Sequence, residues 1–163
     1  TATTTIPETH PIKNIRVEQC AESDTMFQVK LDIDAEKAHN AYYQLFTCEG
    51  TDNRLFVASY LGSIDGAALK KNKEITVYRS HRLATGKKYI PFFCLNDTLA
   101  IKLAHIDNVS YNFWSDYSRN LTMADNLFMA PTHNIRGNVN GATGYWCGMG
   151  ADVKYVVIKK AKE

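Results

Sequence analysis

The sequence lacks most of the patterns that mark a catalytic or membrane-spanning protein. It has no apolar run near the roughly 20 residues that cross a bilayer, and its polar, threonine-rich start is not a signal peptide. It also has no G-x-S-x-G elbow, no C-x-x-C pair and no glycine-rich phosphate loop. We therefore predict no transmembrane segment, no catalytic residue, no metal site and no cofactor.

A strong charge of either sign is absent as well. The chain has 19 basic and 17 acidic residues, for a formal net charge of +2. This balance gives no electrostatic reason to expect nucleic acid as a partner. The apolar fraction is 45% of 163 residues, which is enough for one domain with a real core.

The histidines and cysteines are too scattered to indicate a site. None of the histidines forms a pair at metal-binding spacing; they are His10, His39, His81, His105 and His133. The cysteines are Cys20, Cys48, Cys94 and Cys147. The spacing favours small buried apolar side chains for them but leaves a disulfide open, with three possible pairings.

Alternating apolar and polar residues predict a mainly β domain. The clearest case is 26–33, where Phe27, Val29 and Leu31 share one face. The predicted strands are 12–19, 26–33, 41–48, 54–61, 75–79, 89–95, 98–106 and 152–159. Short strands separated by turn residues favour an antiparallel, immunoglobulin/fibronectin-like β-sandwich. We assign 1–11 as a lead-in and 12–163 as one sandwich domain, with 34–40 as a polar turn.

One helix interrupts this pattern near residues 107–121. Apolar residues recur at steps of three and four, namely Ile106, Val109, Phe113, Tyr117 and Leu121, and Trp114 widens the stripe. Asp107, Asn108 or Ser110 could cap its start. The simplest role for a single amphipathic helix here is to cover an open end of the sandwich core.

A glycine-rich stretch follows the helix and carries two aromatic residues, Tyr145 and Trp146. Exposed rings of this kind can stack on sugars, so they are candidates for ligand binding. The alternative is that they belong to the core, where large aromatic side chains contribute most of the buried area.

Residues 99–146 resemble a family of Bacteroidetes cell-envelope lipoproteins that is catalogued as a domain of unknown function (four-two-four-nine). The resemblance rests on these segments: Leu99-Ala100-Ile101-Lys102-Leu103, Tyr111-Asn112-Phe113-Trp114, Asp125-Asn126-Leu127-Phe128 with Pro131, Asn134-Ile135-Arg136-Gly137 and Gly144-Tyr145-Trp146. Upstream, Asp34 and Asn40-Ala41-Tyr42-Tyr43 are similar to the family's aspartate and paired-tyrosine strand.

The chain departs from the family pattern at one turn. Gly137 and Gly144 stand seven positions apart, whereas the family keeps these glycines nearly adjacent. Because glycine permits unusual backbone angles, we expect any ligand-binding role to fall here. The candidate ligand-binding residues are Asn134, Arg136, Tyr145 and Trp146.

The resemblance implies a non-enzymatic accessory or adhesion-type domain of an outer-membrane lipoprotein. The lipid anchor would lie upstream of this chain, which would be the C-terminal domain of a longer protein or a short relative. The implied location is the outer-membrane surface or periplasm, and the partners would be a TonB-dependent receptor or a surface glycan. Thr25 and Thr98, each after aspartate, resemble O-glycosylation acceptors. A carbohydrate-binding module and a hydrolase built from distant loops are the alternatives.

Overall fold

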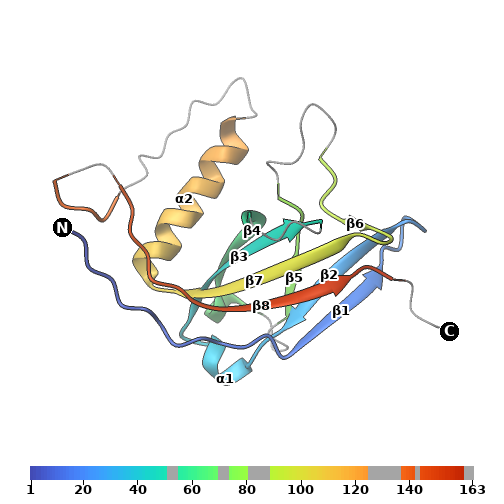
Figure 1. Cartoon of the computed structure of the whole chain (residues 1–163), viewed down its shortest axis with the longest axis horizontal. Coiled ribbons are helices and arrows are strands. Elements are labelled where there is room, and N and C mark those ends of the chain that lie inside the picture. The colour runs from blue at the N-terminus through green and yellow to red at the C-terminus, as the bar shows by residue number, and fades with distance from the viewer. Residues whose placement is uncertain (51–54, 70–73, 81–88, 125–136, 142–143, 160–163) are drawn as a thin grey trace.

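The computed structural model describes residues 1–50, 55–69, 74–80, 89–124, 137–141 and 144–159, with side chains for all of these except 121–124. Two antiparallel β-sheets face each other, and a long helix stands against one of them (Figure 1). The predicted mainly β architecture of two antiparallel layers is therefore confirmed.

The first sheet, sheet A, is built around a hairpin. Its strands are β1 (Asn14–Gln19), β2 (Met26–Asp32), β5 (Glu74–Val77) and the short β6 (Phe93–Cys94). The strand β2 lies between β1 and β5 and also pairs with β6 through Phe27 and Phe93. The prediction of a longer strand over 89–95 was wrong, because within this range only Phe93 and Cys94 pair with another strand.

The second sheet, sheet B, has the order β4-β3-β7-β8. Its strands are β3 (Tyr42–Glu49), β4 (Val57–Asp65), β7 (Thr98–Ile106) and β8 (Gly150–Val157). The central pair β3–β7 aligns Phe46 with Lys102 and Tyr43 with His105. These two pairs bring together residues that lie more than 50 positions apart in the sequence.

The core fills the space between the two sheets. Every second residue of β2 points into it, and Phe27, Val29 and Leu31 are each at most 2% exposed. Leu99, Ile101 and Leu103 enter from β7 in the same way. Burying such side chains contributes roughly 1.5–3 kcal/mol each, so the alternation read from the sequence also identifies the main source of stability.

The outer faces of the two sheets differ. Sheet A carries charged side chains outward, joined in ion pairs: Arg16 with Asp32 and Glu74, and Lys30 with Glu18. The outer face of sheet B carries a second apolar cluster. Its buried members are Phe46, Ala104 and Ile106, with Tyr42, Phe56, Ala58, Tyr111, Trp114, Cys147 and Met149 packed around them.

The helix α2 (Asn108–Ala124) covers part of this second cluster. Asp107 caps it by accepting a 2.7 Å hydrogen bond from the Ser110 backbone N–H. The predicted buried stripe was wrong in phase, because Val109 is 56% exposed while Ser110 is fully buried. The predicted role was also wrong: the helix packs on the outer face of β3 and β4, not over the end of the core (Figure 1).

A short helix replaces the polar turn that the sequence suggested. Residues Ala35–Ala38 form α1, and the side chain of Asp34 accepts hydrogen bonds from the backbone N–H groups of Glu36 and Lys37. Lys13 pairs with the same carboxylate at 2.8 Å. Together these contacts lower the pKa of Asp34 to about 2, the Lys13 hydrogen bond being the largest cause.

The strand β4 is longer than predicted and contains a bulge. It continues to Asp65, where the 3₁₀ turn η1 (Gly66–Ala68) begins, and its register with β3 shifts between Gln44 and Phe46. The irregular stretch of β4, between Ala58 and Ser63, includes Leu61, which has a positive φ of 53°. The buried Gln44 side chain holds the bulge by donating to the Leu45 carbonyl and accepting from Ser63.

None of the four cysteines, all of which are described, forms a disulfide, and only Cys48 is buried. The prediction that they are small buried residues is therefore wrong for Cys94, which is exposed, and holds only in part for Cys20 and Cys147. Across the described residues, no group of three or more acidic, histidine or cysteine side chains is arranged to hold a metal ion. Within the same residues, no helix has the length and apolar character to cross a membrane.

Candidate functional site

The predicted ligand-binding turn is only partly described. Asn134 and Arg136 lie outside the described residues. Tyr145 and Trp146 lie in an extended segment between α2 and β8. The two rings have different surroundings, so the structure does not join them into one platform.

Trp146 is the exposed member of the pair, with 59% of its surface accessible. Its backbone is fixed by Asn138, whose side-chain amide donates to the Trp146 carbonyl at 2.6 Å and accepts from the Trp146 N–H at 2.7 Å. The asparagine side chain thus satisfies both backbone polar groups of Trp146, as a paired strand would. An exposed indole on a fixed backbone is suited to binding, because little conformational entropy remains to be lost.

Two glycines allow the chain to come close to itself here. A Cβ on Gly137 would overlap the Gly144 carbonyl, and one on Gly148 would stand 2.7 Å from the Thr5 carbonyl oxygen. The N-terminal residues run beside the turn: Thr1 and Asn140 exchange two backbone hydrogen bonds of 3.2 Å. The predicted lead-in therefore braces the segment that carries Trp146.

Tyr145 is a packing residue. Its ring stacks flat on Phe113 of α2, with the centroids 3.8 Å apart and the planes parallel. Its hydroxyl is buried and forms no hydrogen bond of normal geometry. Burial is the main reason that the pKa of Tyr145 is raised, and Cys147 acts in the same direction. The core alternative holds for this ring.

The structure also assembles a cluster that the sequence did not reveal. His10, from the N-terminal segment, is 7% exposed and shares a 2.7 Å hydrogen bond with the Tyr43 hydroxyl of β3. It stacks on His105 of β7 at 4.1 Å between ring centroids. The Nδ1 of His105 in turn lies 2.7 Å from the Glu8 carbonyl oxygen, so that nitrogen donates.

Burial controls the electrostatics of this cluster. It is the largest cause that lowers the pKa of His10, followed by the charge of His105, and it raises the pKa of Tyr43 to about 12. Both groups are therefore neutral near pH 7. A histidine with a partner is what the hydrolase hypothesis required, but this ring is enclosed by Tyr43, His105 and the N-terminal segment.

An open depression of about 670 Å³ lies elsewhere, at the far end of the β1–β2 hairpin. Its lining includes Cys20, Glu22, Met26 and Phe92. Neither Tyr145 nor Trp146, and neither histidine of the cluster, is among the described residues that line it. The depression contains no pair of facing carboxylates, so it does not supply the other arrangement that a hydrolase would need.

These features define a mainly β domain of two antiparallel sheets with one covering helix and a braced, tryptophan-bearing turn. The family model described as Domain of unknown function (DUF4249) matches residues 1–154, so the chain belongs to this family. No curated protein and no solved structure matches the chain.

Proposed function

We propose that this chain is a non-enzymatic, surface-exposed accessory or adhesion-type domain of a bacterial outer-membrane lipoprotein. In this proposal it works with a TonB-dependent nutrient uptake system. A lipid anchor outside the chain holds it at the outer-membrane surface or in the periplasm. Membership in the family supports the proposal, because the family is the one whose resemblance implies a cell-envelope lipoprotein.

The observation that carries a binding role is the exposure of Trp146. Tryptophan is enriched among the residues that dominate binding energy in protein interfaces, and such residues are most effective when their backbone is already ordered. Asn138 and the N-terminal segment provide that order. The indole is therefore the proposed anchor for the partner.

The test is a pull-down from envelope membranes with the purified domain as bait. We expect a TonB-dependent receptor among the captured proteins, identified by mass spectrometry. Trp146→Ala should reduce its recovery at least tenfold, because about 1.4 kcal/mol or more of binding energy is lost. Leu55→Ala is the matched control, since Leu55 is also an apolar exposed side chain, at 72%.

The proposal fails if Trp146→Ala recovers as much receptor as the unchanged domain, or if no envelope protein is captured. Asn138→Ala provides a finer arm. It leaves the indole in place but removes both hydrogen bonds to the Trp146 backbone. We expect weaker capture from it than from the Leu55→Ala control.

A carbohydrate-binding module is the second candidate, and the same exposed indole favours it. A single flat ring is enough to stack on one sugar face, although Tyr145 is not available beside it because its ring stacks on Phe113. A glycan array separates the two candidates. Binding that is lost in Trp146→Ala would support the module, and an array without hits would remove it.

A further inference from the structure

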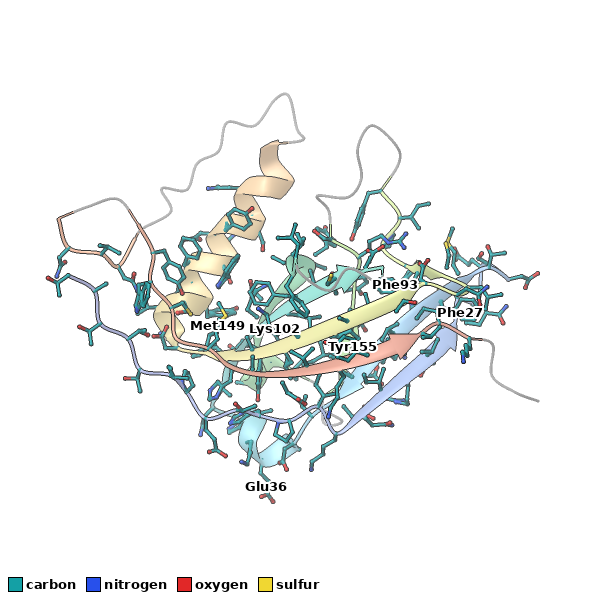
Figure 2. All side chains as sticks on the ribbon, in the orientation of Figure 1. Phe27, Glu36, Phe93, Lys102, Met149 and Tyr155 are labelled. Atoms are coloured by element: carbon teal, nitrogen blue, oxygen red, sulfur yellow. The ribbon has the colours of Figure 1, made fainter. Side chains whose placement is uncertain are left out.

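A separate feature lies on the outer face of sheet B. Lys102 of β7 stands in a row across the sheet, with Phe46 of β3 directly opposite on one side and Val153 of β8 on the other. Its ammonium lies 4.4 Å from the centre of the Phe46 ring and 5.0 Å from that of Phe56. In Figure 2, Lys102 lies between α2 and Tyr155 of β8.

Within the described residues, the charge of Lys102 is not paired with an anion. None of the ion pairs between described residues involves this side chain, and desolvation by burial alone lowers its pKa. Lys30, on the outer face of sheet A, contacts Glu18 at 2.7 Å and Glu74 at 3.4 Å. A half-buried cation held only by two rings is an incomplete site, because cation–π contacts replace part of its hydration but not a counter-ion.

A second donor beside the same ring lacks an acceptor. The Trp114 indole approaches Phe46 edge-on at 5.3 Å, and its N–H is buried without a partner in the described part of the chain. The Lys102 ammonium, in contrast, is not among the polar atoms that are both sealed from solvent and unpaired. It can therefore be reached from outside, and the two rings that it contacts, Phe46 and Phe56, supply no anion.

The surface next to Lys102 is apolar and open. Val153 and Tyr155 share its face of the sheet, since their partners on β7 are Lys102 and Ala100. Tyr155 is 63% exposed and Val157, farther along the strand, is 43% exposed. The helix α2 packs against β3 and β4, whereas β8 lies at the other edge of the sheet.

We propose that this surface binds a carboxylate carried on a short apolar body. The carboxylate pairs with the Lys102 ammonium, where partial burial strengthens the charge-assisted hydrogen bond. The apolar body lies on Val153 and Tyr155. This site is distinct from the Trp146 turn, and it accepts one negative group beside an apolar surface, which excludes polyanions and neutral sugars as its preferred ligands.

The experiment uses the domain with Trp146→Phe, so that Trp114 is the only tryptophan and its fluorescence reports on the Phe46 surroundings. Hexanoate is titrated as the probe, and hexanamide serves as its neutral counterpart. We expect a saturable fluorescence change with hexanoate and at least a tenfold weaker response with hexanamide. Because Trp146 is absent throughout, the result does not depend on the proposed function.

Substitutions then locate the charge. Lys102→Met keeps the length and apolar stem but should weaken hexanoate binding at least tenfold, whereas Lys102→Arg should retain it. Lys154→Met is the matched control, since Lys154 on neighbouring β8 already pairs with Asp152 at 3.8 Å. A thermal melt of each variant confirms that it is folded. The proposal is overturned by an absent hexanoate response, by equal responses to both probes, or by unchanged binding in a folded Lys102→Met variant.

Discussion

The two outer faces of the sandwich differ in how their charged side chains are paired. Sheet A satisfies its charges internally, with Arg16 and Lys30 each contacting carboxylates on neighbouring strands. Sheet B presents rings and a lysine that has no ion pair among the described residues. Buried polar atoms without a hydrogen-bond partner occur on both faces, with Arg16 Nε on sheet A and the Trp114 indole nitrogen beside sheet B, so the contrast lies in the pairing of the charges. The difference directs attention to sheet B and the segment after α2 as the parts for which binding is proposed.

The largest expected effect tests whether the sheet B face is packed as tightly as a core. Phe46 is 5% exposed and contacts both Lys102 and Trp114. Phe46→Ala should lower the free energy of unfolding by about 3 kcal/mol, because a large buried ring leaves a cavity. Thr76→Ala, on the outer face of sheet A opposite Lys30, should change it by less than about 0.5 kcal/mol. Urea denaturation measures both, and equal costs would remove the contrast.

Removing the hydroxyl of Tyr43 and that of Tyr145 should have different effects on stability, because only the Tyr43 hydroxyl has a hydrogen-bond partner of normal geometry. Tyr43→Phe should cost about 1–2 kcal/mol, since it leaves the buried His10 nitrogen without its 2.7 Å partner. Tyr145→Phe should change stability by less than about 0.5 kcal/mol or increase it slightly, because its hydroxyl is buried without a partner while its stacking on Phe113 remains. A larger loss of stability in Tyr145→Phe than in Tyr43→Phe would contradict this difference in hydrogen bonding.

The histidine cluster predicts a loss of stability in acid. The folded pKa of His10 is below the unfolded value of about 6.5, so the unfolded state takes up protons first as the pH falls. The groups facing His10 are Tyr43, His105, Lys37, Glu8 and Asp34. The stability that neutral His10 supports is complete above pH 6.5 and is lost below it.

Thermal melts between pH 7.5 and 5.5 check this expectation. The melting temperature of the unchanged domain should fall by about 2–4 °C over this range from the His10 contribution. His10→Phe should flatten that dependence, whereas His39→Gln, at an exposed position, should not. A slope that persists in His10→Phe would assign the effect to other groups.

The smallest effect concerns the charged face of sheet A. Arg16→Gln removes contacts to Asp32 and Glu74, and it should destabilise the domain slightly at low salt. The difference should shrink in 1 M NaCl, where the Debye length is about 3 Å. Parallel melts at low and high salt measure it. Lys102→Met should show no such salt dependence, because no ion pair is lost.

Local periodicity was enough to predict the layers of the fold. Phe27, Val29 and Leu31 alternate with polar residues within one strand, so their shared face is visible in the sequence. The same reasoning found the helix but misplaced its buried side, because Val109 is apolar and yet faces solvent while the small Ser110 fits against the sheet. Close packing against Phe46 and Tyr42 decided the phase, and hydrophobicity alone does not encode that packing.

The site was harder to predict because it depends on contacts between distant segments. Nothing in the sequence indicates that His10 and His105 lie together. They meet because the N-terminal segment lies over the β3–β7 pair, in which Tyr43 is aligned with His105. The sequence left open whether Trp146 is exposed or part of the core, and the structure shows it exposed, while its ligand-binding role stays a prediction. Its bracing could not be foreseen, because it requires the N-terminal residue Thr1 to meet Asn140 and the Asn138 side chain to bond the Trp146 backbone.

The bulge in β4 has a consequence for the solubility of the domain. β4 ends its sheet, and a regular end strand offers unpaired backbone groups on which a second molecule can build. Leu61, with its positive φ, interrupts that edge and turns the backbone out of register. We therefore expect a neighbouring molecule to be unable to pair regularly along the whole of β4, which disfavours aggregation through this edge of the sheet.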